Sequence, residues 1–353
     1  MTDENLPYKN PVKNSWSAWK WFVAGLLLIY FLVFMPTPYV IYEPGSAEAV
    51  KPMVEVAAGD NVERGTFMLT TVRRTYANMA LLAWSSLDKT TQIAKKEDAL
   101  QGRSEAEYST ALTFMMSGSQ SNAVLAAYNK VGVPYQIVKH GIFVIYNDPK
   151  IAHNEFVTND RIDTIEGVKT NGYEDIQKAL HNRKAGETLT VKVEREGKLI
   201  DVKATLAAFV SSQSPDKKII GFGIQYGEKK EIVPADSGKK IVFKDSDIGG
   251  PSAGLMFTLE LINRLTPGDL THGHKIAGTG EITPDGQVGI IGGIQHKVVA
   301  ADREGAVMFL APEGNYAEAK AKVDTMDTKM KLVSVRTLDD ALRALDELDA
   351  AGK

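Results

Sequence analysis

The amino-acid sequence predicts a multidomain α+β protein that begins with a transmembrane helix. Three observations carry this prediction: an uncharged apolar run at 21–35, alternating side chains around a turn at 189–206, and two glycines that lead into an apolar helix at 249–261. They are typical of a membrane helix, of a β-hairpin and of a helix that starts from a tight loop. At roughly 150 residues per domain, a chain of 353 residues should hold two or three domains.

The composition excludes several classes of protein. Lys and Arg number 41 and Asp and Glu 44, so the net charge of −3 offers no basic surface for nucleic acid. The chain has no cysteine, which excludes disulfide scaffolds, thiol proteases, zinc fingers and iron–sulfur sites. His272 and His274 have metal-ligand spacing, but no carboxylate pair or third histidine stands out near them, so we expect a loop at Pro267–Gly273 and no metal site.

The N-terminal apolar run at 21–35 is typical of a membrane anchor. Trp21–Met35 alone is somewhat shorter than a hydrocarbon core of roughly 30 Å requires, and Trp16, Trp19 and Tyr39 extend it with aromatic residues at both ends. Three lysines precede the run and two glutamates follow it, namely Lys9, Lys13, Lys20, Glu43 and Glu48. By the positive-inside rule, residues 1–36 form a cytoplasmic tail and a single-pass anchor in the cell membrane, with the rest of the chain outside the cell.

The sequence allows two alternatives to an anchor. Ala47-Glu48-Ala49 resembles a signal-peptidase site, but it lies far beyond the apolar run, and Pro36 and Pro38 intervene. A buried core helix is disfavoured by the flanking lysines and tryptophans. An uncleaved anchor is therefore the prediction.

Residues 37–121 carry the weakest signals, and we expect a mixed α/β region of unassigned role there. Phe67–Val72 is rich in β-branched residues and predicts a strand, whereas residues 75–118 have a mostly helical pattern. The Ser/Gly stretch 117–121 is typical of a linker, which places a domain boundary after residue 121.

Residues 122–210 predict a small β-rich domain. Its expected elements are a helix from 122 to 130, a strand at 141–146, a strand and turn at 159–167, a helix at 173–182 and a hairpin at 189–206. The polar stretch 211–216 then joins this domain to the next one, which begins near residue 218.

This order of elements resembles a bacterial-type PDZ domain, through the Gly141–Val144 element, the Asn159–Ile162 turn and the helix at Tyr173. The resemblance implies that the C-terminus of a peptide adds as a strand beside Ile142–Ile145, against the helix at 173–182. The implied peptide-binding residues are Gly141, Ile142, Phe143, Val144 and Tyr173, with N–H groups near Gly141 holding the carboxylate. The alternative is that these apolar residues only form a core.

The segment around Ser252 has the properties of a nucleophile loop. Gly249 and Gly250 allow a tight loop, and Pro251 is favoured in a first helical turn, so Ser252 would sit at a helix N-terminus. Free N–H groups and the helix dipole there favour a developing oxyanion. A serine that merely caps the helix is the simpler reading of these residues taken alone.

Lys297 is the candidate general base. It is followed by Val298-Val299-Ala300-Ala301, and a lysine with such neighbours can be drawn into a low-dielectric site. Desolvation would lower its pKa and yield a neutral amine that takes the proton from Ser252. Taken alone, a lysine at this position would instead be read as a solvated surface residue. A triad that recruits the adjacent His296 is a third possibility, which we disfavour.

Three blocks in the right order give this region a family resemblance. Gly250–Gly254, Thr279–Ile282 and Gly292–Lys297 together resemble the proteolytic domain of Lon-type serine proteases, over residues 218–353. Gly249 stands where ATP-dependent members of that family carry Asp.

The resemblance implies roles for individual residues. Ser252 takes the position of the nucleophile, Lys297 that of the general base, and Thr279 that of a threonine that orients the lysine. The implied oxyanion loop contains Gly249, Gly250 and Ala253. This chemistry requires no cofactor.

The whole chain resembles the membrane-anchored, PDZ-containing Lon-like proteases of Gram-positive bacteria. No G-x-x-x-x-G-K-[ST] motif occurs in the sequence, so we expect no ATP-driven unfolding. The expected function is that of an ATP-independent serine endopeptidase that acts on exported or membrane-associated proteins and peptides. Its expected partners are peptide substrates and the lipid bilayer, without nucleic acid or ATP, and the oligomeric state is left open. The alternative is a catalytically silent peptide-binding scaffold, against which the intact Ser252/Lys297 pair argues.

Overall fold

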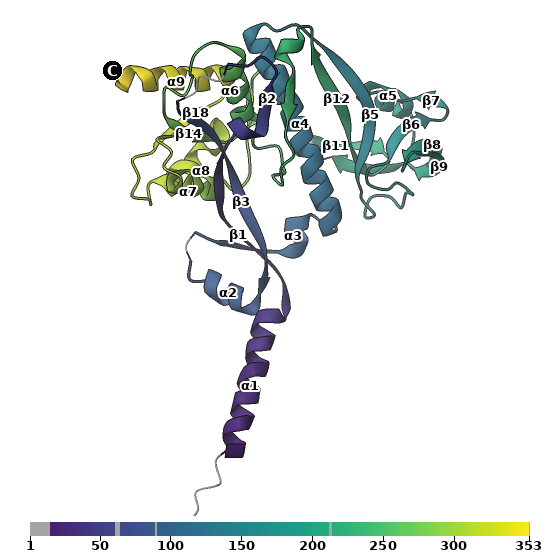
Figure 1. Cartoon of the computed structure of the whole chain (residues 1–353). Coiled ribbons are helices and arrows are strands. Elements are labelled where there is room, and N and C mark those ends of the chain that lie inside the picture. Colours follow the sequence, from purple (N-terminus) through teal and green to yellow (C-terminus); the bar gives the residue numbers. More distant parts are fainter. Residues whose placement is uncertain (1–14, 61–63, 89, 212–213, 353) are drawn as a thin grey trace, which may run out of the picture. The chain divides into compact units, whose positions relative to one another are not determined.

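The computed structural model describes residues 15–60, 64–88, 90–211 and 214–352 (Figure 1). The predicted cytoplasmic tail, with Lys9 and Lys13, lies outside the described residues. The chain divides into two compact units. One contains Met1–Glu43 and Arg73–Gln101, and the other contains Pro44–Val72 and Gly102–Lys353.

The first unit combines the N-terminal helix with the outer part of a β-ribbon. Its elements are α1 (Ser15–Phe34), the first half of β1 (Pro36–Ala49), the second half of β3 (Thr66–Asn78), α2 (Met79–Ser85), β4 (Gln92–Lys95) and α3 (Lys96–Leu100). Strand β4 pairs antiparallel with β1, so that Tyr39 lies opposite Lys95. The side chain of Asn78 accepts a hydrogen bond from Leu81 N at the start of α2 and donates one to Val33 O at the end of α1.

Helix α1 leaves its apolar side chains exposed within this unit, including Trp21 at 77% and Phe34 at 67%. Among the residues that the structure describes, no helix has both the length and the apolar character needed to cross a bilayer. The transmembrane helix predicted from the sequence is therefore not confirmed.

The second unit is built on parallel strands that lie between two layers of helices. Strand β14 (Lys275–Gly278) pairs in parallel with β3 on one side and with β17 (Met308–Pro312) on the other, and β18 (Lys331–Val335) follows β17. Side chains on these strands alternate between two cores. Phe67, Leu69, Ile276 and Leu310 share one core with α4 (Glu105–Val131), α6 (Gly254–Leu265) and α9 (Leu338–Gly352). Met68, Ala277, Phe309 and Ala311 share the other with α7 (Ile294–Arg303) and α8 (Glu313–Val323).

Helix α4 overturns the boundary predicted after residue 121. Ser104 and Glu107 form a capping box at its start, Gly132 ends it in a left-handed conformation, and 27 residues run between them without a break. The predicted linker at 117–121 lies inside this helix. Its residues Ala123, Val124 and Ala126–Tyr128 are buried in the core that also contains α6. A local Ser/Gly stretch suggested a linker, but tertiary packing against α6 holds it as helix.

The same core includes residues from the region 37–121, to which we had assigned no role. Val50, Val54, Phe67, Leu69 and Met116 are buried there together with Leu255 and Leu259 of α6. Their partners on α6 lie about 140 to 210 residues further along the chain, so no local pattern could reveal this packing. Two short pairings complete this part of the fold, β2 (Val54–Val56) with β13 (Ile241–Phe243) and β15 (Glu281–Ile282) with β16 (Val288–Gly289).

The predicted β-rich domain is present as one antiparallel sheet with the order β12-β5-β6-β8-β9. Its elements are β5 (Tyr135–Asn147), β6 (Arg161–Ile165), β7 (Val168–Lys169), α5 (Tyr173–Leu180), β8 (Thr188–Arg195), β9 (Lys198–Thr205) and β12 (Ile224–Pro234). The hairpin expected at 189–206 is β8–β9, which turns at Glu196-Gly197 with positive φ at both residues. Strands β10 (Ala207–Ser211) and β11 (Ser214–Gly221) form a further hairpin across the expected joint, whose residues 212–213 lie outside the described part.

This β-rich domain is inserted into the chain of the α/β domain. Helix α4 precedes it, and β13 and α6 follow it, yet all three contribute to one core. The two ends of the insertion meet, because Ala235 N donates a hydrogen bond of 2.8 Å to Pro134 O. The α/β domain that we expected to begin near residue 218 therefore also uses strands and a helix from before the insertion.

Candidate active site

The loop before Ser252 lies directly on helix α4. Gly250 N donates a hydrogen bond of 2.9 Å to Leu112 O, and a Cβ at Gly249 would stand 2.8 Å from Leu112 Cβ. Gly250 has a φ of +93°. Both glycines are therefore needed, one for close approach and one for its backbone conformation.

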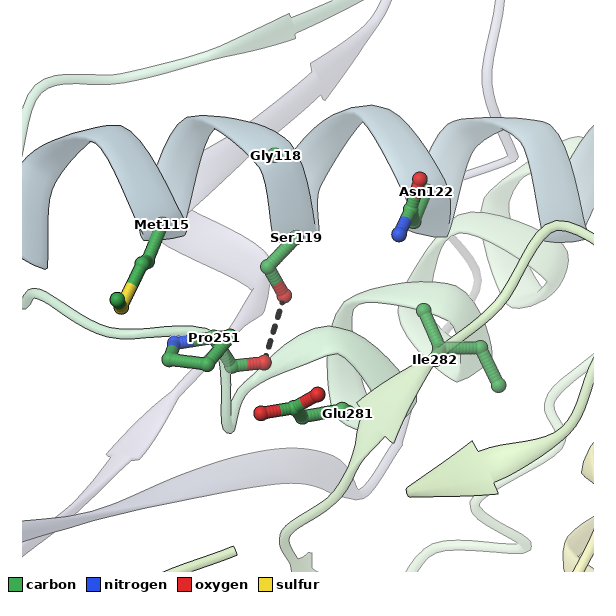
Figure 2. A pocket seen from close by; sticks show the side chains of 7 residues that line it. All are labelled: Met115, Gly118, Ser119, Asn122, Pro251, Glu281 and Ile282. Atoms are coloured by element: carbon green, nitrogen blue, oxygen red, sulfur yellow. Dashed lines mark hydrogen bonds between the residues drawn. The ribbon is translucent and has the colours of Figure 1, made fainter. Parts of the chain in front are cut away.

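Three hydrogen bonds fix the backbone on either side of the serine. Ser119 Oγ of α4 donates to Pro251 O at 2.8 Å (Figure 2). Gly280 N donates to Ser252 O at 2.8 Å, and Thr279 Oγ1 donates to the same oxygen at 3.0 Å. Ser252 lies two residues before the first residue of α6. It is therefore at the N-terminus of a helix, as predicted.

Lys297 reaches Ser252 from the first turn of α7 and is only 4% exposed. Its Nζ lies 2.8 Å from Ser252 Oγ, 3.1 Å from Thr279 Oγ1 and 2.8 Å from Thr70 O. Burial away from water lowers the pKa of this amine from 10.5 to about 7. A neutral amine carries two N–H groups, which suit Thr70 O and Thr279 Oγ1, and its lone pair then faces the hydroxyl of Ser252.

Thr279 holds the lysine from the end of β14. Its hydroxyl has one proton, which is donated to Ser252 O, so the oxygen is left to accept from Lys297 Nζ. The residue is 1% exposed, and its backbone N–H is bonded to Leu310 O of the neighbouring strand. Thr279 therefore has one orientation, and it links the nucleophile backbone to the lysine.

Sequence reasoning missed the third partner of the lysine, the carbonyl of Thr70. This residue lies on β3 and its own hydroxyl donates to Gly278 O at 3.2 Å. A main-chain carbonyl has no signature in a sequence, and the pairing of β3 with β14 spans about 200 residues. No local signal could have found it.

The predicted oxyanion loop needs one correction. The N–H of Gly250 already donates to Leu112 O, so it is not available to a substrate oxygen. The N–H groups of Gly249 and Ala253 remain predicted donors.

A cavity of about 310 Å³ adjoins the nucleophile loop on the α4 side (Figure 2). It is lined by Met115, Gly118, Ser119, Asn122, Pro251, Glu281 and Ile282. Figure 2 shows the carboxylate of Glu281 and the side chain of Met115 on either side of Pro251. The cavity places a mixed apolar and acidic surface next to the residue that precedes Ser252.

The two histidine alternatives do not match the geometry. Ser252 Oγ is bonded to Lys297 Nζ, whereas His296 is the preceding residue on α7 and is itself buried. Over the described ranges, no three His, Asp or Glu side chains gather as a metal site would require, and this includes the neighbourhood of His272 and His274.

The structure contradicts the predicted peptide-binding edge at Gly141–Val144. Strand β5 is flanked on both sides: Val144 pairs with Tyr226 of β12, and Ile142 pairs with Ile162 of β6. Ile142 and Val144 are core residues at 0% and 1% exposure, Gly141 packs against the side chain of Arg161, and Phe143 lies 5.7 Å from the amine of Lys229. No additional strand fits beside β5.

The edge strand next to β5 is β12, which the sequence analysis did not identify. Tyr173 lies at that edge, since its hydroxyl accepts a hydrogen bond of 2.9 Å from Glu228 N and its ring is 5.9 Å from that of Tyr226. Strand β12 begins about 80 residues after β5, so their pairing could not be read locally. The turn Gly221-Phe222-Gly223 before β12, with Phe222 buried and Gly223 at a φ of +69°, is a signal that could have marked it.

Comparisons with known proteins match two parts of the chain to protein families. Residues 239–347 match the Lon protease (S16) C-terminal proteolytic domain, and residues 129–206 match the PDZ domain. The chain carries a Lon-type serine peptidase domain and a PDZ domain. Both assignments were predicted from the sequence.

Similar curated proteins are Lon proteases. That of Fervidobacterium nodosum is 35% identical over 134 residues, covering 37% of this chain and 16% of the relative. That of Rickettsia felis is 30% identical over 174 residues, covering 45% and 21%, and that of Campylobacter concisus is 38% identical over 95 residues, covering 27% and 12%. The chain spans about a fifth or less of the length of these relatives.

Two solved structures are also similar to parts of the chain. The solution structure of GtR34C from Geobacillus thermodenitrificans has 27% identity and a TM-score of 0.21, covering 24% of this chain and 94% of that one. The PDZ domain of the SdrC-like protein from Listeria monocytogenes has 18% identity and a TM-score of 0.22, covering 26% and 92%.

Proposed function

We propose that this protein is a serine endopeptidase that works without ATP through the Ser252/Lys297 pair. The observation that carries the proposal is the buried Lys297 amine, with a pKa of about 7, at 2.8 Å from Ser252 Oγ. A general base is most effective when its pKa lies near the working pH. The absence of a phosphate-binding motif from the sequence supports independence from ATP.

The proposed reaction has two stages. Neutral Lys297 takes the proton of Ser252 as Oγ attacks the substrate carbonyl, and the oxyanion accepts hydrogen bonds from the loop that includes Ala253. The C–N bond breaks as protonated Lys297 gives its proton to the leaving amine. Water then attacks the acyl ester, with Lys297 again as the base, and Ser252 regains its proton.

The test uses purified full-length protein in detergent and an unstructured substrate such as β-casein. Ser252→Ala and Lys297→Ala should each abolish cleavage, and Lys297→Arg should also be inactive because a guanidinium stays charged. Lys320→Ala, at an exposed ion pair on α8, is the matched control and should keep wild-type activity. If both dyad variants retained activity, the catalytic assignment would be wrong.

The alternative is a silent scaffold that only binds peptides. The three oxygens around Lys297 Nζ, two of them on buried residues, support an enzyme, because a lysine that had lost its function would have no reason to stay desolvated. Absence of casein cleavage by the wild-type protein over pH 6–9, together with intact peptide binding, would favour the scaffold.

We further propose that peptide C-termini add as a strand to the outer edge of β12, beside α5, and that the incoming backbone replaces the Tyr173 hydroxyl as the partner of Glu228 N. Antiparallel addition would place the carboxylate at the turn that opens β12, where backbone N–H groups could hold it. Gly223 in this turn has no room for a side chain, since a Cβ would stand 2.9 Å from Ile151 Cγ2. Gly223→Val should therefore weaken binding of C-terminal peptides in fluorescence anisotropy, and C-terminal amidation of the peptide should do the same.

Finally, we propose that α1 attaches the protein to the cell membrane, with the peptidase outside the cell, as the resemblance to the proteases of Gram-positive bacteria implies. The exposed apolar surface of α1 supports this location. The chain has no cysteine, so a single Leu199→Cys on exposed β9 can be labelled without background. A membrane-impermeant maleimide should label it in intact cells. Labelling that required permeabilised cells would overturn the orientation, and release by carbonate would overturn the attachment.

A further inference from the structure

We propose that a polar cavity between β12, α4 and the loop 243–249 holds the part of the substrate that lies between its bound C-terminal tail and the bond that is cut. The enzyme would then cut at a set distance upstream of that tail. This inference rests on the proposed peptidase function and on tail binding at β12.

One face of β12 lies against α4, opposite the face that carries Tyr226. Gln225 accepts a hydrogen bond of 2.6 Å from Arg103 Nη2, and a Cβ at Gly227 would overlap the ring of Phe114. Side chains alternate between the two faces of a strand, so Lys229 lies on the same face of β12 as Gln225 and Gly227. Figure 1 shows α4 beside β12 and β5 along this stretch. Strand β12, which would bind the tail, therefore packs against α4, the helix to which the nucleophile loop is hydrogen-bonded.

The cavity connects these two parts. It has a volume of about 460 Å³ and reaches from Lys229 on β12, past Leu112 of α4, to Gly249 at the start of the nucleophile loop. Most of its other lining is polar or charged, namely Ser109, Thr113, Ser117, Gln120, Lys244, Asp245, Ser246 and Asp247. This lining offers both hydrogen-bond donors and hydrogen-bond acceptors. It therefore suits an extended polypeptide, whose own N–H and C=O groups need partners, better than it suits an apolar side chain.

The direction of the bound tail decides which side of the substrate enters the cavity. An antiparallel tail has its carboxylate at the start of β12, so residues further upstream lie toward Lys229. A strand rises roughly 3.3 Å per residue, so the tail covers about 17 Å between Ile224 and Lys229. With the cavity and the approach to Ser252 added, the cut bond should lie about ten residues from the C-terminus.

The two products of the cut have different fates. The upstream part of the substrate forms the ester with Ser252 Oγ as the C–N bond breaks. The downstream part, which carries the tail, leaves as an amine after it receives the proton from Lys297. Its new amino terminus lies in the cavity as long as its carboxylate is held at β12, so this product dissociates only after the tail is released.

The experiment uses 25-residue peptides in which one five-residue block is repeated four times before a randomised five-residue tail. Each cleavable bond then recurs every five residues, so the choice among repeats reports distance alone. Mass spectrometry of the products from full-length protein should show cleavage concentrated at least tenfold in one repeat. Adding one block at the N-terminus should leave this distance unchanged, and amidating the C-terminus should remove the preference.

Thr113→Trp tests the cavity itself, because the larger side chain fills it from α4. It should lower cleavage of the tailed peptides at least tenfold more than it lowers cleavage of a short amidated peptide, and anisotropy should still detect binding of the tail at β12. Ala106→Trp, at an exposed position in the first turn of α4, should change none of these. Equal cutting in every repeat by an active enzyme would overturn the inference alone, whereas the absence of any cleavage, of casein included, would count against the proposed function.

Discussion

At the scale of single residues, the site depends on keeping one amine neutral. Lys297 has a pKa lowered to about 7 by burial, and in the unfolded chain it would return to about 10.5. Between these values the unfolded state binds one more proton than the folded state. The contribution of this group to stability therefore rises with pH across the window from about 7 to 10.5, and below pH 7 it is constant.

The same shift predicts the pH dependence of catalysis. The value of kcat/KM for a short peptide should rise through about pH 7 as Lys297 loses its proton, and should level off above it. Initial-rate assays from pH 5 to 9, in one buffer system of constant ionic strength, measure this pH dependence of kcat/KM. Activity that was flat across that range would show that a different group controls proton transfer.

Thr279 makes a second prediction at this scale. Thr279→Val removes both the donor to Ser252 O and the acceptor for Lys297 Nζ, so kcat should fall about 10- to 100-fold. Thr279→Ser keeps the hydroxyl and should retain most activity. Loss of activity in the serine variant as well, with normal thermal unfolding, would indicate that the methyl group and not the hydroxyl is required.

At the scale of elements, α4 is the support of the nucleophile loop. Ser119→Ala removes the hydrogen bond to Pro251 O and leaves that carbonyl without its donor, which should cost about 1–3 kcal/mol of unfolding free energy and lower kcat. Ser121→Ala, two residues further along the same helix, is the matched control. Denaturant unfolding and kcat for a short peptide measure both effects. Equal changes in the two variants would mean that α4 responds generally and not through Pro251.

How far the sequence could predict this arrangement depends on distance along the chain. Ser252, Thr279 and Lys297 lie in short contiguous blocks, and each block sits next to the turn or helix that positions it. Thr70 O and the face of α4 reach the site through strand and helix packing across more than 100 residues, which no local pattern encodes. Strand β12 was missed for the same reason, because β6, α5, β8 and β9 all lie between it and its partner β5 along the chain.

At the scale of the whole molecule, the PDZ domain is an insertion whose two ends lie together. Since Ala235 N bonds to Pro134 O, a short turn can replace residues 136–233 without stretching the chain. Deleting 122–210, the domain bounds predicted from the sequence alone, would instead remove the buried end of α4 and part of its core.

The excised protein should keep the peptidase site and lose selection by the tail. Its α4, α6 and α7 remain, with Ser252, Thr279 and Lys297 in place, so a short peptide should be cut within about threefold of the wild-type rate, a change under 1 kcal/mol. Phe114 and Arg103 would lose their partners on β12 and β5, so a modest loss of thermal stability is expected. Tailed peptides should be cut at every repeat with equal yield. If cleavage of the short peptide disappeared while circular dichroism showed a folded protein, the PDZ domain would be required for catalysis itself and would not act by recruitment alone.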